Sequence, residues 1–581
     1  MKIRIFALLI TAITLASCGN GDKEKHESTA AAGNVYYGGV LRLNEVEDFR
    51  SLYPLSVTDV ISHRIANQIY EGLVKLSQKD LSIQPGLAES WEISDSAKKF
   101  IFHIRKGVKF HDNPAFPNGQ GREVNAQDIK YCFDKMCANA PENQASNFFQ
   151  NKVIGAKEYY QSTTEKKPLP GGVSGIKVID DYTLEIDLAY PFSGFLNLLT
   201  TAYTWIYPKE AFDKYGIEMR VNAVGTGAFK IKNIKEGLGV VLEKNPNYWR
   251  SDANGNKLPY LEAIKFTFIK EKKSELLEFK NGNIDMVYQL PLEMIKDVTS
   301  ELENAKKENI PFVLQNTPAQ TVYYLGFQHQ SKLFSNKLVR QAFNYAIDRN
   351  SIVIYTLQGE GVPGNYGIVP PAYKNYDVTK LKGYEFNPEK AKKLLADAGY
   401  PGGKGFPALT LQINSGGGDR NIQTAEVVQK MLKENLNIDV KFNVMPLAQH
   451  IEALESGKSE FWRLGWIADY PDPENFLNIL YGANVPADPK ANSFVNPVRY
   501  KSDKFDSLFL AGLKETDEAK RNAFFLQAEQ VAIDDAAIMP IFYDENTRLL
   551  QVFVKNFDVN AMEYRDLSEV YIDPTLKEKK K

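Results

Sequence analysis

The spacing of apolar residues in the first part of the chain predicts both a helix and strands. Between residues 60 and 70, three isoleucines recur at every fourth position, which places them on one face of a helix that Asp59 or Thr58 can cap. In residues 99–109, apolar side chains alternate with polar ones before a Lys-Gly turn, which is typical of a half-buried strand. Residues 182–188 repeat this alternation. We therefore expect a helix followed by two strands.

The clearest unit lies in the second half of the chain. Asn387 stands before a proline and can cap a helix that Gly399 ends. Residues 409–413 then alternate as a strand, residues 425–432 carry apolar side chains at helical spacing, and residues 438–444 alternate again. This order is β-α-β and predicts a parallel sheet with helices on its faces, where ligands bind beyond the strand ends.

The size and composition are those of a multi-domain globular protein. The chain has 581 residues, of which 43% are hydrophobic and 24% are charged, and at roughly 150 residues per domain about four folding units are expected. Lysine and arginine number 70 and aspartate and glutamate 72, which leaves a net charge of −2. This balance creates no field that would recruit a polyanion, so we expect no nucleic-acid partner.

The N-terminus has the pattern of an export signal. Lys2 and Arg4 precede an apolar run over residues 5–16, which is too short to span a bilayer. The run ends in Leu-Ala-Ser-Cys, which resembles the lipobox of bacterial lipoproteins and implies cleavage before Cys18 and lipidation of its sulfur. Residues 1–17 are therefore predicted to be a lipoprotein signal peptide. An ordinary signal peptide with a chance cysteine is the alternative.

The segment after this signal is predicted to be a tether. Residues 19–33 contain no apolar periodicity and no bulky side chain, so they bury too little surface to fold. We expect residues 18–34 to be the lipidated cysteine and a flexible linker, which spans about 20 Å. Stable anchoring requires more than one acyl chain.

The remaining reactive side chains form no recognisable metal-binding or catalytic motif. Cys132 and Cys137 are five residues apart on a predicted helix, about 140° around its axis, so we expect two buried free thiols. The six histidines form no close metal-ligand pair. We expect no metal, no cofactor and no enzymatic activity.

Several short phrases, each weak alone, together resemble the family 5 extracellular solute-binding proteins, the lipoprotein or periplasmic receptors of peptide-type ABC importers. The resemblance covers nearly all of residues 35–573. In the family's order, the phrases are YEGLV at 70–74, PGLAESW at 85–91, KGVKFHD at 106–112, NAQD at 125–128, VGTGAF at 224–229, NPNYW at 245–249, NGNID at 281–285, VRQAF at 339–343 leading to AID at 346–348, and GWIADYPDP at 465–473.

The resemblance implies an α/β fold of the periplasmic-binding-protein type, class II, with two lobes that close like a clam and an extra domain inserted in the first. Closure would need only a few residues, near Leu314 and Ile541, to change their backbone angles. The implied ranges are 35–75, 195–313 and 542–581 for the first lobe, 76–194 for the inserted domain, and 314–541 for the second lobe.

The resemblance also implies a ligand site on the GWIADYPDP phrase. In peptide-binding members, the aspartate that matches Asp469 receives the ligand's α-amino group, and backbone groups near Gly465 and Ile467 pair with the peptide as an added strand. A backbone ladder holds an extended peptide without reading its side chains. A turn residue before Tyr470-Pro471 is the structural alternative for Asp469.

Three further side chains are weaker candidates. Trp466 and Tyr470 can line the ligand site or belong to the core. Thr226 lies in a Gly-Thr-Gly turn of the first lobe, where turn geometry alone explains the flanking glycines.

The sequence thus predicts an exported, lipid-anchored, monomeric substrate-binding protein that captures short peptides and delivers them to an ABC permease in the inner membrane. The alternatives are the same fold binding an oligosaccharide or a nickel chelate, a surface lipoprotein hydrolase, and an adhesive lipoprotein. A hydrolase would need a nucleophile, a base and oxyanion donors in one pocket.

Overall fold

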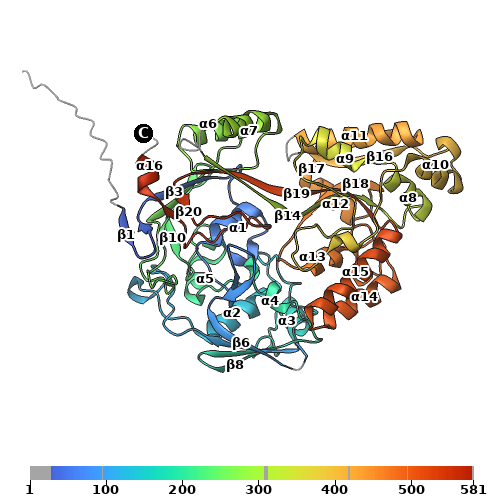
Figure 1. The fold of residues 1–581 in the computed structure, drawn as a ribbon. Helices are drawn as coiled ribbons and strands as arrows, with labels where there is room; N and C mark the ends of the chain where they lie inside the picture. Colours follow the sequence, from blue (N-terminus) through green and yellow to red (C-terminus); the bar gives the residue numbers. More distant parts are fainter. Residues whose placement is uncertain (1–27, 95, 306–311, 416–418, 494, 579–581) are drawn as a thin grey trace, which may run out of the picture.

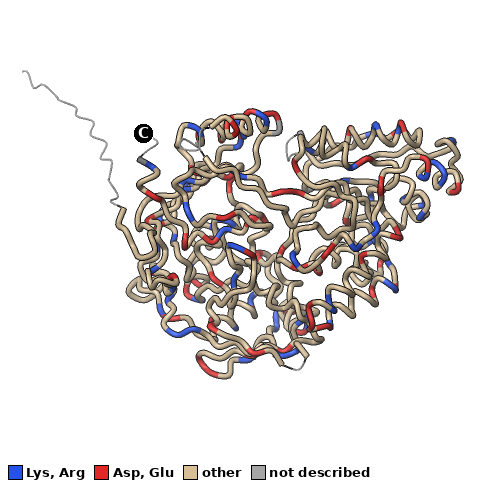
Figure 2. Tube along the Cα trace, in the orientation of Figure 1, with Lys and Arg blue, Asp and Glu red and all other residues tan. Residues whose placement is uncertain are grey.

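The computed structural model describes residues 28–94, 96–305, 312–415, 419–493 and 495–578 (Figure 1). The predicted signal peptide 1–17 and Cys18 lie outside these residues. Among the described residues, no helix has the length and apolar character needed to cross a membrane. Figure 2 shows basic and acidic residues interspersed along the chain in both halves of the molecule.

Two long strands, β14 (Phe312–Phe327) and β19 (Ile538–Gln551), run through both halves of the molecule (Figure 1). They belong to a seven-stranded sheet with the order β13-β19-β14-β18-β16-β17, to which β15 (Val362–Pro363) adds at β19. We call the part on the side of β13 (Met286–Tyr288) lobe I and the part on the side of β18 (Phe461–Ile467) lobe II.

Lobe II contains the β-α-β unit that the sequence predicts. Strand β16 (Leu409–Ser415) pairs in parallel with β17 (Val440–Pro446), and α11 (Asp419–Leu436) connects them. Helix α10 (Pro388–Asp397) begins where predicted, because the Asn387 side chain accepts a hydrogen bond from a backbone N–H of its first turn. The other helices of lobe II are α8 (Lys337–Tyr345), α9 (Arg349–Ser351), α12 (Leu447–Glu455), α13 (Pro473–Leu477), α14 (Asp503–Lys514) and α15 (Glu518–Asp534).

Lobe I is built on a four-stranded sheet and carries a second sheet beneath it (Figure 1). Helix α1 (Val60–Ala66) is capped by Asp59, one of the two predicted caps. The first sheet has the order β10 (Phe229–Lys235), β11 (Gly239–Lys244), β12 (Ala263–Thr267) and β3 (Val40–Asn44). The second has the order β6 (Ala88–Ser94), β7 (Lys99–Ile104), β9 (Thr183–Asp187) and β8 (Ile176–Asp180). Strands β7 and β9 confirm the two predicted from alternation.

Short elements complete lobe I. Its helices include α2 (Ala126–Cys137), α3 (Ala156–Thr164), α4 (Phe195–Leu198), α5 (Lys209–Tyr215), α6 (Lys272–Lys280), α7 (Ile295–Asn304) and α16 (Pro574–Glu578). Its short strands are β1 (Thr29–Ala31), β2 (Val35–Tyr37), β4 (Val74–Leu76), β5 (Ile83–Pro85), β20 (Val554–Lys555) and β21 (Tyr571–Ile572).

The predicted tether is wrong at its C-terminal end. Strand β1 pairs antiparallel with β2, so residues 29–31 are ordered against lobe I. The Asn256 side chain adds hydrogen bonds to the backbone N–H and carbonyl of Ala32 at 3.3 and 2.9 Å. Composition shows only that a segment cannot bury apolar surface, whereas a neighbouring strand edge supplies hydrogen bonds that need no apolar side chain.

The pairing of β14 with β19 is interrupted where the strands pass between the lobes. It runs from Phe312 to Pro318 opposite Gln551 to Glu545, and resumes at Val322 opposite Tyr543. Residues 319–321 therefore face Asp544 alone, which is an enlarged bulge. Leu314 pairs with Leu549 on the lobe I side of this break, and Ile541 lies on the lobe II side. The hinge stays a prediction, and the break lies between the two residues that we expected to carry it.

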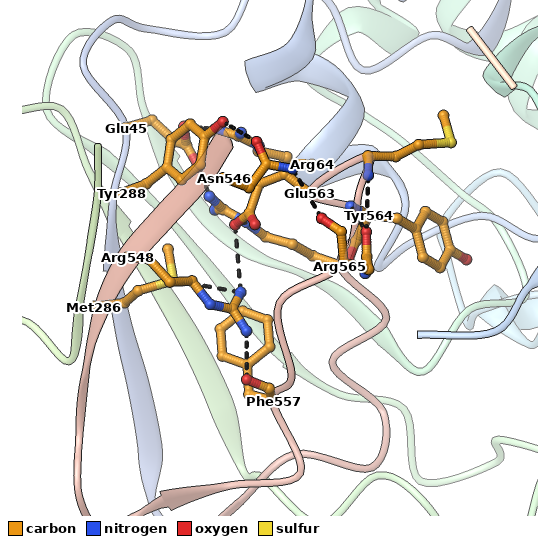
Figure 3. Close-up of polar contacts among 12 residues, drawn as sticks. Glu45, Arg64, Met286, Tyr288, Asn546, Arg548, Phe557, Glu563, Tyr564 and Arg565 are labelled. Atoms are coloured by element: carbon orange, nitrogen blue, oxygen red, sulfur yellow. Dashed lines mark hydrogen bonds and ion pairs between the residues drawn. The ribbon is translucent and has the colours of Figure 1, made fainter. Parts of the chain in front are cut away.

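Below the break, a cluster of five buried charges fixes the strands in lobe I (Figure 3). Glu45 accepts from Arg565 at 2.6 Å and from Arg64 at 2.8 Å. Glu563 accepts from Arg565 at 3.1 Å and from Arg548 at 3.3 Å. Burial alone would raise the pKa of Glu563, but the three arginines hold it below its usual value.

Arg548 makes this cluster part of the strand pair. It belongs to β19, and its Nε donates to Gln315 Oε1 of β14 at 2.7 Å, while Nη2 donates to the carbonyl of Phe557. Two strands and the C-terminal segment are thus tied to one buried guanidinium group. Removing a carboxylate from such a cluster leaves buried cations without compensation, which costs far more than the loss of a surface ion pair.

We expect Glu563→Gln to lower the free energy of unfolding by about 3–5 kcal/mol at pH 7. Because the folded-state pKa is depressed, this contribution is present above the usual carboxyl pKa and is lost as the pH falls through the folded value, so the difference from the natural protein should shrink in acid. Urea unfolding at several pH values measures both effects. Glu236→Gln, which removes an exposed partner of Arg220, is the control and should leave the unfolding midpoint almost unchanged. Equal small effects of the two variants would contradict a structural role for the cluster.

Candidate functional site

Strand β18 carries the predicted site and has one edge that is only partly paired. On one side it pairs with β14 along its whole length, from Phe461 opposite Phe327 to Ile467 opposite Thr321. On the other side its pairing with β16 ends at Trp462. Beyond Trp462, no strand of the described residues covers this second edge.

The backbone groups of Gly465 and Ile467 point to that edge. In an antiparallel pair, successive residues direct their N–H and C=O groups alternately toward and away from the partner strand. Ala468 N donates to Gln320 O at 3.0 Å, so the even-numbered residues of β18 face β14. The odd-numbered residues therefore face the open edge.

A side-chain contact supports this assignment and marks where the open stretch begins. His450 Nε2 lies 2.8 Å from the carbonyl oxygen of Arg463, an odd-numbered position, and so occupies the edge there. Gly465 and Ile467, further along, have no such partner among the described residues. The structure thus leaves two N–H donors and two carbonyl acceptors available for another extended chain.

Asp469 follows directly after this edge and has no cationic partner among the described residues. Its side chain is exposed, while the neighbours Ala468 and Tyr470 are buried. It reaches solvent, yet enough protein surrounds it that burial raises its pKa, opposed only by a hydrogen bond from Asn475 Nδ2 to Oδ2 at 3.2 Å. The Asp469 charge also acts on Tyr203 of lobe I. Burial raises the pKa of Tyr203 to about 12, and the nearby negative charge of Asp469 makes a smaller contribution in the same direction.

Trp466 lies beside this carboxylate. Its indole Nε1 donates to Asn475 Oδ1 at 2.8 Å, and its ring is half-buried. Asn475 therefore contacts both Trp466 and Asp469. Ile467 is 53% exposed, which fits a position on an accessible strand edge.

The structure gives no support for ligand contact by two of the predicted residues. Tyr470 is buried, and its hydroxyl donates to Glu474. Thr226 is also buried, and its hydroxyl donates to Glu71 Oε2 at 2.8 Å. Both side chains have their polar atom bonded within the protein, which the sequence phrases alone could not reveal.

Arg463 was not among the residues predicted from the sequence. Its guanidinium carbon lies 4.6 Å from the centroid of the Tyr323 ring, and Nη1 donates to Asn414 Oδ1 at 3.0 Å. Burial lowers the pKa of Arg463, and no carboxylate among the described residues forms an ion pair with it. The period-two spacing of a strand places Arg463 and Gly465 on one face, which is a signal that could have identified it.

Tyr323 explains why position 465 is a glycine. A Cβ at Gly465 would lie 2.8 Å from two carbons of the Tyr323 ring. The ring therefore covers the strand where a side chain would otherwise project, and Arg463 stacks on it. The two residues shape the sheet face beside the open edge.

The described residues contain neither a metal-binding cluster nor a cysteine with a lowered pKa. No group of three or more His, Cys, Asp or Glu residues among them is placed to hold a metal ion. Cys132 and Cys137 are free and buried, as predicted, and burial raises the pKa of both thiols. Neither cysteine has the lowered pKa of a reactive thiol.

Known proteins similar to this chain include solute receptors of bacteria. One relative is the periplasmic oligopeptide-binding protein OppA of Escherichia coli (strain K12), which is 30% identical over 557 residues, 94% of this chain and 95% of that protein. Heme-binding protein A of Haemophilus influenzae is 27% identical over 518 residues, 87% of each chain.

Solved structures share the fold over nearly the whole chain. The periplasmic binding protein DppA from Helicobacter pylori, in complex with the peptide STSA, has a TM-score of 0.75 and 26% identity over 92% of this chain and 98% of that chain. The oligopeptide-binding protein OppAIV from Borrelia burgdorferi has a TM-score of 0.72 and 26% identity over 92% and 99%. The predicted two-lobe α/β clamshell is confirmed.

The family description "Bacterial extracellular solute-binding proteins, family 5 Middle" matches residues 82–487. The matched residues include the second sheet of lobe I and strand β18, which Asp469 follows. The chain belongs to the family 5 extracellular solute-binding proteins.

Proposed function

We propose that this protein is a lipid-anchored receptor of an ABC importer that binds a short peptide between its lobes and delivers it to the permease. One observation carries the proposal. An unpaired strand edge at Gly465 and Ile467 runs directly into Asp469, a carboxylate without a cationic partner among the described residues. An extended chain with a free amino end complements both features.

The open edge suits the backbone of a peptide. Gly465 and Ile467 offer two donors and two acceptors, which match two alternate residues of an antiparallel guest strand. Main-chain hydrogen bonds hold such a guest whatever its side chains, as in other cases of strand addition. The site therefore favours peptides over solutes that lack a regular series of amide groups.

The Asp469 carboxylate suits the amino end of that peptide. An ammonium group about 4 Å from a carboxylate gains about 4 kcal/mol at an effective dielectric constant near 20. A micromolar affinity corresponds to about 8 kcal/mol, so this one contact supplies a large share of it. Asp469 reaches solvent, but enough protein surrounds it that its pKa is raised, and no cation among the described residues compensates its charge.

Arg463 supports a limit on peptide length. It lies six residues before Asp469, which is about 20 Å along an extended chain. An antiparallel guest whose amino end meets Asp469 runs toward Arg463, and a guanidinium group without an ion-pair partner among the described residues suits its carboxylate end. We infer that peptides of up to about six residues fit this span.

Contacts between the lobes support binding by closure. Asn197 of α4 in lobe I donates through Nδ2 to Asp472 Oδ2 of lobe II at 3.0 Å. Asp472 is itself held within lobe II, where Arg521 donates to both of its carboxylate oxygens at 2.7 Å. A guest that contacts both lobes would favour an arrangement in which the lobes lie together over one in which they lie apart, since closure needs differential contacts.

A different solute is the main alternative, because a relative of similar length is named a heme-binding protein. A haem or an oligosaccharide has no ammonium group and would not form the proposed ion pair with Asp469. Competition of each solute against a tripeptide separates these possibilities.

We expect Asp469→Ala to weaken binding of free-amino tripeptides by roughly 100-fold or more, because the ligand's ammonium group loses its partner. N-acetylated forms of the same peptides should bind poorly to the natural protein and be little affected by the substitution. Isothermal titration calorimetry with both peptide forms measures this. Equal affinities of the natural protein for free and acetylated peptides would rule out the ion pair.

We expect Ile467→Pro to weaken all peptides by roughly ten-fold, acetylated ones included, because proline removes one N–H of the open edge. The melting temperature should change little, since this N–H is not part of the pairing with β14. Trp466→Pro is the matched comparison. Its N–H faces β14, so it should lower the melting temperature markedly. If Ile467→Pro left affinity intact, the guest would not pair with this edge.

We expect Cys18→Ser to move the protein from the membrane to the soluble fraction of cells, because the acylated sulfur would be lost. Fractionation followed by immunoblotting measures the distribution, and labelling with a radioactive fatty acid checks the modification itself. Continued membrane partition of the variant would contradict a lipid anchor at this residue.

A further inference from the structure

We propose that Asn475 is a positioning residue that holds the Asp469 carboxylate in the orientation that receives the ligand's ammonium group. This inference rests on the proposed function, because it concerns the same site. Selectivity for a free amino end would then depend on two residues, Asp469 just after β18 and Asn475 in the short helix α13.

Three hydrogen bonds fix Asn475 against the strand end. Nδ2 donates to Asp469 Oδ2 at 3.2 Å, and Oδ1 accepts from the backbone N–H of Asp469 at 3.2 Å and from Trp466 Nε1 at 2.8 Å. The orientation of the amide is unambiguous, because two donors require its oxygen and the carboxylate requires its nitrogen. Asn475 is 5% exposed, so its side chain has little freedom to release these partners.

The local fold places Asn475 for this task. Helix α13 begins after Asp472, whose side chain accepts from the backbone N–H of Glu474, and Pro473 stands at its first position. Arg521 in turn holds Asp472 through both of its carboxylate oxygens. The start of α13 is therefore held in lobe II. Asn475, on this helix, bonds to the backbone N–H and the carboxylate of Asp469 and so restrains the turn that contains it.

The arrangement leaves one oxygen of Asp469 for a ligand. Oδ2 accepts from Asn475, whereas Oδ1 has no hydrogen bond among the described residues. Of the elements packed around it, lobe I contributes Tyr203 and α13 contributes Asn475, and no other titratable or charged group of the described residues acts on the Asp469 charge. The bond from Asn475 is thus the only contact that lowers the pKa of this carboxyl group against burial.

Asn475→Leu tests the proposal, because leucine keeps the volume and removes all three hydrogen bonds. Calorimetry with a free-amino tripeptide and its N-acetylated form, at several pH values from 5 to 8, is the measurement. We expect the free-amino peptide to bind roughly ten-fold or more weakly to the variant at pH 7, as loss of a hydrogen bond to a charged group implies. The affinity for the acetylated peptide should be unchanged.

The pH profile gives a readout that a merely structural role would not move. Binding of the ammonium group requires ionised Asp469, so affinity is present above the pKa of that carboxyl and is lost as the pH falls through it. Without the bond from Asn475 the pKa rises further, and the loss of affinity should begin at a higher pH than in the natural protein. An unshifted profile, or equal weakening of both peptides, overturns the proposal.

Two more variants keep the test decisive. Asn478→Leu is the matched control, since Asn478 lies three residues further along and its Oδ1 accepts from Asn484. It should leave both the preference for the free-amino peptide and the pH profile unchanged.

If leucine at position 475 prevents folding, Asn475→Asp replaces it, because aspartate retains the two acceptor contacts. It places a second carboxylate against Asp469, which raises the pKa of the pair, so affinity for the free-amino peptide should begin to fall at a higher pH than in the natural protein. A natural protein that binds neither peptide would instead refute the proposed function.

Discussion

The hydrogen-bonded pair of β14 and β19 is the constraint on which the rest of the structure depends. Both strands extend from one lobe into the other, so a single sheet connects the two lobes. The same β14 pairs with β18 on one side, and on the opposite edge no strand of the described residues pairs with β18 beyond Trp462. The break at residues 319–321 interrupts the pairing where the strands pass from one lobe to the other.

Charged side chains have different environments on the two sides of that break. In lobe I, Glu45 and Glu563 are each bonded to two arginines, so the cluster in Figure 3 is compensated within the protein. At the end of β18, Asp469 is closely surrounded but has only an uncharged partner in Asn475. A compensated cluster stabilises the fold, whereas the uncompensated carboxylate is the feature on which the proposed contact with a ligand's ammonium group rests.

Much of the local structure could be predicted because it depends on neighbours in the sequence. The caps at Asp59 and Asn387 and the alternation in β7 and β9 are set by spacing within a few residues, and each was found where expected. The tether was wrong at residues 29–31, because their order comes from a partner strand and from Asn256, more than two hundred residues away. Thr226 and Tyr470 were chosen from their motifs, but the glutamates that bind their hydroxyl groups could not be read from those motifs.

The sequence by itself determined the family, the two-lobe fold and the phrase that carries Asp469, since the ordered phrases resemble one family and that resemblance implies its fold. Only the tertiary structure decided which backbone groups of that phrase are free, that Asn475 holds the carboxylate, and that Arg463 lacks an ion-pair partner among the described residues. The physical reason is that hydrogen-bond satisfaction and desolvation depend on every atom within a few ångströms, and the chain assembles those atoms from distant segments.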